Sequence, residues 1–279
     1  GMISPIGSFG QGGFTGTTLW IDPGSDTYVI VLANVIHQRG GPPVVTLSGD
    51  CRWARQGWST TLARAEARSR QFDWVSDGAL ELTGNAEGVT FRRFAARDSA
   101  ARIEITGRWA VPGGSYEWTG RASGLELGRL GLPLEWELSG TADAVLTVTG
   151  RAGDPRWVFE SSARRPGALG HSGDAAHLLL GGGPGSLEVR DLEYRLGDGA
   201  LRGELAFDGT RDAWPDTLTA TGVRDWLATA SAWKGRLTAG AFPLDRLDRL
   251  VPAAKGLWGR LAGTLEIGGR PGAPELSLK

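Results

Sequence analysis

The chain has 279 residues, with 44 glycines, 14 prolines and a formal net charge of −1. So many glycines and prolines disfavour a helical protein, and the near-zero charge excludes the basic surface with which a nucleic-acid-binding protein attracts phosphates. The hydrophobic share of 41% excludes a disordered tail, and Cys51, the single cysteine, excludes an intrachain disulfide framework.

The first forty residues predict a β-hairpin. Two β-rich runs, residues 14–20 and 27–34, flank the sequence Asp22-Pro23-Gly24. Proline presets φ and glycine supplies positive φ, so this sequence favours a turn. Residues 39–43 (RGGPP) then interrupt any regular structure. We therefore predict two parts, a hairpin over residues 1–43 and a β-sheet domain over residues 44–279.

From residue 44 onward, short alternating runs are punctuated by glycine. Ile103 and Ile105 alternate with Arg102 and Glu104, the pattern of a half-buried antiparallel strand. Residues 60–70 also suit a helix by propensity, but their context favours a strand. The predicted strands cover residues 44–53, 59–68, 78–83, 89–94, 102–110, 115–122, 134–139, 144–149, 156–161, 176–180, 186–194, 200–208, 217–221, 234–239, 259–267 and 275–278.

One sequence motif occurs twice: residues 150–155 (GRAGDP) are similar to residues 269–274 (GRPGAP). Upstream, residues 127–130 (LGRL) are echoed by residues 244–247 (LDRL). A unit that cannot bury its apolar face alone usually repeats to extend a sheet. The prediction is an all-β fold, an extended, twisted and curled antiparallel sheet like a groove. Short helices are expected at residues 224–232 and 244–251.

Residues 7–23 (GSFGQGGFTGTTLWIDP), with residues 28–34, resemble the late segment of serine β-lactamase and penicillin-binding-protein-like hydrolases. The resemblance covers residues 4–40. In that family this strand carries a His-x-Gly or Lys-Thr-Gly element that lines the active site, whereas this chain has Gln11 followed by two glycines. Ser231 and Lys234 match the family's Ser-x-x-Lys spacing, but downstream of this segment rather than upstream. We therefore expect no enzyme, the alternative being a truncated or inactive hydrolase fragment.

Residues 44–279 resemble AsmA-like and TamB-like envelope proteins, through glycine-punctuated apolar runs such as residues 138–155 and 261–274. The resemblance implies a segment of a curled sheet with an apolar inner groove that spans the bacterial periplasm and takes part in phospholipid transport and outer-membrane biogenesis. It implies phospholipid acyl chains as ligands, and an outer-membrane assembly protein as a partner contacted through regions outside this chain. Because the two resemblances are unrelated, the junction near residues 35–50 is either a genuine fusion or a chimeric gene.

The candidate groove lining consists of alternating apolar residues, although the sequence does not reveal which face of the sheet is the inner one. An acyl chain needs a continuous apolar track and no hydrogen-bond donors. The twelve tryptophans suit core packing, which is the default, or the wall of a groove. For the chain as a whole, the remaining alternative is a generic β scaffold. The candidates are Ile103, Ile105, Leu146, Val148, Leu187, Val189, Leu205, Phe207, Leu265 and Ile267.

No cofactor, metal or catalytic residue is expected. His37, His171 and His177 are scattered without clustered ligands at metal-binding spacing. The aspartates lie in turn-like stretches, where their side chains favour turn geometry. No run approaches the roughly 18 to 20 apolar residues of a membrane-spanning helix, and the start lacks the order of a signal peptide, so as written the chain is expected to be soluble.

Overall fold

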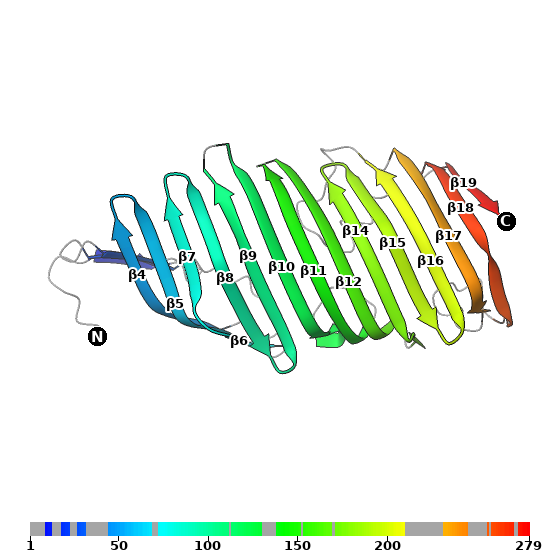
Figure 1. Cartoon of the computed structure of the whole chain (residues 1–279), viewed down its shortest axis with the longest axis horizontal. Coiled ribbons are helices and arrows are strands. Elements are labelled where there is room, and N and C mark those ends of the chain that lie inside the picture. Colours follow the sequence, from blue (N-terminus) through cyan, green and yellow to red (C-terminus); the bar gives the residue numbers. More distant parts are fainter. Residues whose placement is uncertain are drawn as a thin grey trace.

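The computed structural model describes residues 9–12, 18–22, 27–31, 44–68, 72–111, 113–129, 138–151, 153–168, 171–209, 231–244, 256, 258–270 and 273–279. These residues form antiparallel strands almost throughout, with one 3-10 turn, η1 (Leu127–Arg129). The strands build a three-stranded sheet and a 16-stranded sheet (Figure 1). The predicted all-β, curled antiparallel fold is confirmed.

The small sheet contains the predicted hairpin. Strands β2 (Thr18–Asp22) and β3 (Thr27–Val31) pair antiparallel across the predicted turn, with Asp22 opposite Thr27. A further strand, β1 (Phe9–Gly12), pairs with the other side of β2. Residues 32–43 lie outside the described residues. The predicted domain boundary, between residues 43 and 44, falls at the end of this stretch. Most of the junction at residues 35–50 falls within it.

The large sheet is a meander, because strands that follow one another in the chain are nearly always hydrogen-bonded neighbours. The predicted strands are found over the described residues, and β5 excludes the helical alternative for residues 60–68. The 16 strands are β4 (Val44–Ala54), β5 (Gly57–Arg68), β6 (Asp73–Ser76), β7 (Leu80–Asn85), β8 (Gly88–Asp98), β9 (Ala101–Ala110), β10 (Ser115–Glu126), β11 (Ser139–Arg151), β12 (Asp154–Ala168), β13 (His171–Ser172), β14 (Ala175–Gly183), β15 (Ser186–Leu196), β16 (Gly199–Asp208), β17 (Ala232–Pro243), β18 (Arg260–Arg270) and β19 (Ala273–Leu278).

Some predicted elements cannot be compared with the structure. Most of the helices predicted at residues 224–232 and 244–251, the strand at residues 217–221 and most of the strand at residues 134–139 lie outside the described residues. The last residue of the first predicted helix, Ala232, is described and begins β17 instead. Three short strands, β1, β6 and β13, were not predicted. β6 and β7 both pair with β5 and with β8, so together they fill one position in the sheet.

The sequence repeat is also a structural repeat. Residues 150–155 and 269–274 form the same hairpin connection, in which Gly150 pairs with Pro155 and Gly269 pairs with Pro274. The strand before each hairpin carries the same irregularity, a register shift after Ala122 in β10 and after Ala239 in β17. The unit β10–β11–β12 therefore returns as β17–β18–β19, which extends one sheet as the sequence predicted.

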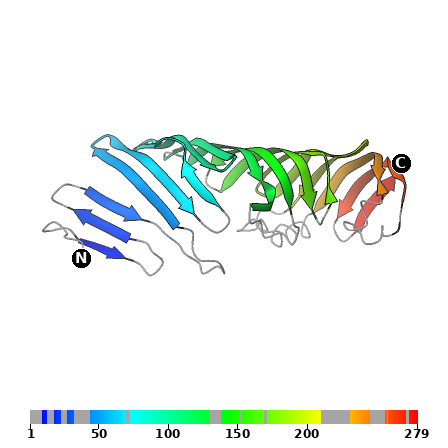
Figure 2. The ribbon, with the colours of Figure 1, turned by 90° about the horizontal axis from the view of Figure 1, so that it is seen from below.

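Bulges of this kind recur across the large sheet and account for its curl, because an extra residue on one strand bends that strand and increases its twist. Register shifts interrupt eight of the strand pairs, including β4 with β5, β8 with β9 and β14 with β15. Seen after a 90° turn, the large sheet is a single bent layer (Figure 2). The chain exposes 18976 Å² of surface, against about 11,500 Å² for a compact monomer of this mass.

The repeated bulge leads to a stability prediction. Its left-handed position holds Gly124, with φ of 64°, in the first unit and Ala241, with φ of 50°, in the second. A Cβ in this conformation is strained, so Ala241→Gly is expected to raise the free energy of unfolding by about 0.5–1 kcal/mol. The control is Ala239→Gly, in the same strand, which is expected to lower it by about 0.5–1 kcal/mol. Urea unfolding followed by circular dichroism measures both, and destabilisation by Ala241→Gly would contradict the assignment.

Candidate functional site

The hydrogen-bonded registers sort the side chains of the large sheet onto two faces. Residues paired on neighbouring antiparallel strands point to the same side, and the side alternates along each strand. Ile105 on β9 pairs with Gly120 on β10, which in turn pairs with Leu146 on β11.

Followed from strand to strand, these pairings place all ten candidate groove residues on one face, which we call the apolar face. That these residues line a lipid-binding groove stays a prediction. The ten residues are Ile103, Ile105, Leu146, Val148, Leu187, Val189, Leu205, Phe207, Leu265 and Ile267.

The tryptophans of the large sheet also lie on the apolar face. Every tryptophan on a described strand of the large sheet lies on the apolar face, and none is fully buried. Trp20 belongs to the small sheet, Trp258 lies just before β18 and is 87% exposed, and Trp136, Trp214 and Trp226 lie outside the described residues. Because their rings are partly exposed, they form part of an open surface. The seven are Trp53, Trp58, Trp74, Trp109, Trp118, Trp157 and Trp233.

Glycines on the apolar face make room for these rings. A Cβ added to Gly107 would lie 2.8 Å from the ring of Trp118, and one added to Gly182 would lie 2.7 Å from the ring of Trp157. Each ring therefore lies across the neighbouring strand, where the glycine has no side chain. Trp118 also contacts Phe91 edge-on, with ring centroids 4.8 Å apart. The result is a surface of large apolar groups that continues from strand to strand.

The apolar face is only partly shielded from water. Leu146 is 40% exposed, and the other nine candidates are half-buried. Among the described elements, all substantial contacts run between hydrogen-bonded neighbours, apart from those of η1 with β11. Since none of the ten candidates is fully buried, this face keeps a solvent-exposed surface. The few buried apolar residues are Leu80, Ala95, Ala96, Ala142, Ala239 and Phe242.

The opposite face, which we call the polar face, is lined by charged pairs, some within one strand, such as Glu193 with Arg195 of β15, and some between strands. Glu193 on β15 lies 3.0 Å from Arg195 and 2.9 Å from Arg202 of β16. Hydrogen bonds from Arg195 and then Arg202 lower the pKa of Glu193. Glu266 is similarly held 2.8 Å from Lys279, whose hydrogen bond lowers the pKa of Glu266. The sheet thus separates an apolar surface from a solvated, charge-paired one.

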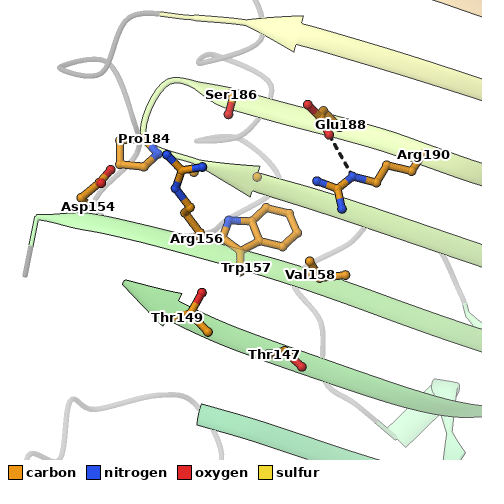
Figure 3. Close-up of a pocket in the computed structure, with 12 residues that line it drawn as sticks. Thr147, Thr149, Asp154, Arg156, Trp157, Val158, Pro184, Ser186, Glu188 and Arg190 are labelled. Atoms are coloured by element: carbon orange, nitrogen blue, oxygen red, sulfur yellow. Dashed lines mark hydrogen bonds and ion pairs between the residues drawn. The ribbon is translucent and has the colours of Figure 1, made fainter. Parts of the chain in front are cut away.

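The polar face has a small hollow of about 350 Å³ at the ends of β11, β12, β14 and β15 (Figure 3). It exists because β14 carries residues 181–183, three glycines, between the side chains of Arg156 and Arg190. Arg190 is engaged by Glu188 at 2.9 Å. The hollow's lining among the described residues includes threonine and serine hydroxyls but no histidine, lysine or cysteine. Its carboxylates are those of Asp154 and Glu188, and the Glu188 carboxylate accepts the hydrogen bond from Arg190.

Ser231 and Lys234, the spacing match to the hydrolase family, lie at the start of β17 rather than on a helix. The Ser231 hydroxyl donates to the backbone carbonyl of Asp208 at 3.0 Å, and Lys234 pairs in register with Ala206. That hydrogen bond engages the proton which a lysine base would have to remove. Gln11 lies in the small sheet, opposite Leu19.

The structure brings together one polar row that the sequence did not reveal. Ser162 on β12 contacts His177 on β14, with Oγ and Nδ1 3.2 Å apart, and His177 Nε2 lies 3.7 Å from a carboxylate oxygen of Asp191 on β15. Ser162 sits in a strand paired on both sides, opposite Asp143 and His177. Since the paired backbone around Ser162 is engaged in the ladder, it does not form the oxyanion hole that acyl transfer requires. We interpret the row as cross-strand polar pairing.

No family model, curated protein or solved structure matches this chain. The described part of the chain contains no group of three or more histidine, cysteine, aspartate or glutamate side chains arranged to hold a metal ion. A helix apolar and long enough to cross a membrane is likewise not found among the described residues.

Proposed function

We propose that this chain is a non-enzymatic segment of a β-groove protein of the AsmA-like and TamB-like kind, which holds phospholipid acyl chains against its apolar face. The observation that supports the proposal is the continuity of that face over the large sheet, on which none of the ten candidate residues is fully buried. An acyl chain has no hydrogen-bonding groups, so its retention requires only apolar surface from which water is excluded.

The dimensions of the face suit this task. Fourteen strand positions, spaced about 4.8 Å apart, give a track of about 60 Å from β4 to β19. Each methylene removed from water contributes about 0.8 kcal/mol, so a chain that buries even part of its length is held without any specific polar contact. The charged polar face keeps the other side solvated. The periplasmic setting, the transport role and the outer-membrane assembly partner come from the sequence resemblance and belong to the same proposal.

The test is to incubate delipidated protein with a phospholipid that carries a photo-crosslinker at the end of an acyl chain. We expect crosslinked peptides from strands such as β9, β11 and β16, with the modified residues on the apolar face. Labelling confined to polar-face residues, or no labelling, would contradict the proposal. A parallel sample treated with a covalent β-lactam probe tests the hydrolase alternative, because acylation of any serine would overturn the non-enzymatic assignment.

A further inference from the structure

A second hollow, of about 110 Å³, lies at the rim of the apolar face where β8 turns into β9, along the lower edge of the sheet in Figure 1. We call it the rim hollow. Asp98, the last residue of β8, pairs there with Ala101 of β9. Besides Ala101, the lining among the described residues consists of the aromatic Phe72 and Trp74, the apolar Leu125, and the charged Asp98, Glu126 and Arg129.

The rim hollow carries one more negative than positive charge. Asp98 is only 7% exposed, and its Oδ2 accepts hydrogen bonds from Arg129 Nη2 at 2.8 Å and from the backbone N–H of Asp73 at 3.1 Å. These partners compensate the buried carboxylate. Glu126 is exposed, and its carboxylate has no hydrogen bond or ion pair with the described residues. One negative charge is therefore left for a ligand to neutralise.

The side chains of the rim hollow suit an organic cation. The faces of aromatic rings such as those of Phe72 and Trp74 attract an ammonium group, and the Glu126 carboxylate accepts its hydrogen bonds. Arg129, whose side chain is 39% exposed, adds a positive charge beside the carboxylates, which suits a ligand that carries a phosphate next to its ammonium group. We propose that the rim hollow binds the ammonium group of an aminophospholipid, such as one with an ethanolamine headgroup. This inference rests on the proposed function and adds the class of lipid to it.

The rim hollow adjoins the proposed acyl-chain track. Ile103 and Ile105, two of the candidate lining residues, follow Ala101 along β9 on the same face. Successive residues on one face of a strand lie about 7 Å apart. A headgroup held in the rim hollow therefore places the glycerol backbone of the lipid beside Ile103 and its acyl chains along the apolar face.

Two photo-crosslinkable phospholipids with identical acyl chains, one with an ethanolamine and one with a glycerol headgroup, test this inference on the delipidated full chain. At equal concentrations below saturation, we expect the ethanolamine lipid to label the wild-type chain about five-fold more, because the glycerol headgroup has no ammonium group. Glu126→Gln removes the uncompensated carboxylate, and Trp74→Leu removes the ring but keeps an apolar side chain. Each variant is expected to lower the ratio of the two labelling yields to about two or less.

Glu87→Gln is the matched control. Glu87 is also an exposed glutamate without an ion pair among the described residues, but it lies in the turn between β7 and β8, at the other end of β8. This substitution is expected to leave the ratio unchanged. Equal labelling of the wild-type chain by both lipids, or equal loss of preference in Glu87→Gln and Glu126→Gln, would overturn the headgroup site, while crosslinks on the apolar face would still support the acyl-chain groove. If neither lipid labelled the chain, the groove and the headgroup site would both be contradicted.

Discussion

Replacing Leu146 with glutamate is expected to reduce phospholipid labelling by about ten-fold or more. Leu146 lies in the middle of the apolar face, between Gly120 and Phe159 on the neighbouring strands. Because Gly120 has no side chain, Leu146 remains 40% exposed and available to an acyl chain. A carboxylate held against methylene groups loses hydration without gaining a partner, at a cost of a few kcal/mol, and each 1.4 kcal/mol is a factor of ten in affinity.

Val158 provides a matched control for this experiment. It lies on β12, next in sequence to Phe159, and is 36% exposed, but it points to the polar face, where it pairs with Thr147. Val158→Glu therefore adds the same charge at nearly the same exposure on the opposite side of the sheet. It is expected to leave labelling unchanged. Equal losses in both variants, with far-UV circular dichroism intact, would show that labelling depends on overall charge rather than on the apolar face.

Replacing Gly107 with valine is expected to destabilise the sheet by about 1–3 kcal/mol, the usual cost of overpacking. A Cβ at this position would lie 2.6 Å from the carbonyl oxygen of Glu117 and 2.8 Å from the ring of Trp118. The ring cannot easily move aside, because Trp118 also packs edge-on against Phe91. The midpoint of urea unfolding, followed by circular dichroism, measures the loss, and tryptophan fluorescence reports displacement of the ring.

The control for Gly107 is Gly120→Ala on the adjacent strand. Gly120 lies on the same face and pairs with Ile105, but the nearest atom to its added Cβ is the carbonyl oxygen of Leu146 at 4.0 Å. This substitution is expected to be neutral or to stabilise by up to about 1 kcal/mol, since alanine restricts the unfolded chain. If both substitutions destabilised equally, the loss at Gly107 would reflect backbone freedom and not the space occupied by Trp118.

Several elements were predictable from local sequence because their signals are local. Alternation around Ile103 and Ile105 predicts β9, and the repeated GRxGxP phrase predicts two equivalent hairpins, both of which the structure contains. β6 was missed because its four residues show too little alternation, and it is a strand because β5 and β8 extend past β7 and leave a position to fill. The Ser162–His177–Asp191 row was missed because residues 14 to 29 apart in sequence meet only through strand register.

By itself, the sequence determined that this chain is built from short amphipathic strands, since alternating side chains and turn-forming glycines act over a few residues. Only the tertiary structure decided that the apolar side chains of these strands share one face. Val189 and Leu192 are three residues apart, which would place them on opposite sides of a regular strand, yet both have apolar-face partners in β16, Leu205 and Gly203. A bulge between them restores the common side, and its position depends on hydrogen bonding between strands, which local sequence patterns do not specify.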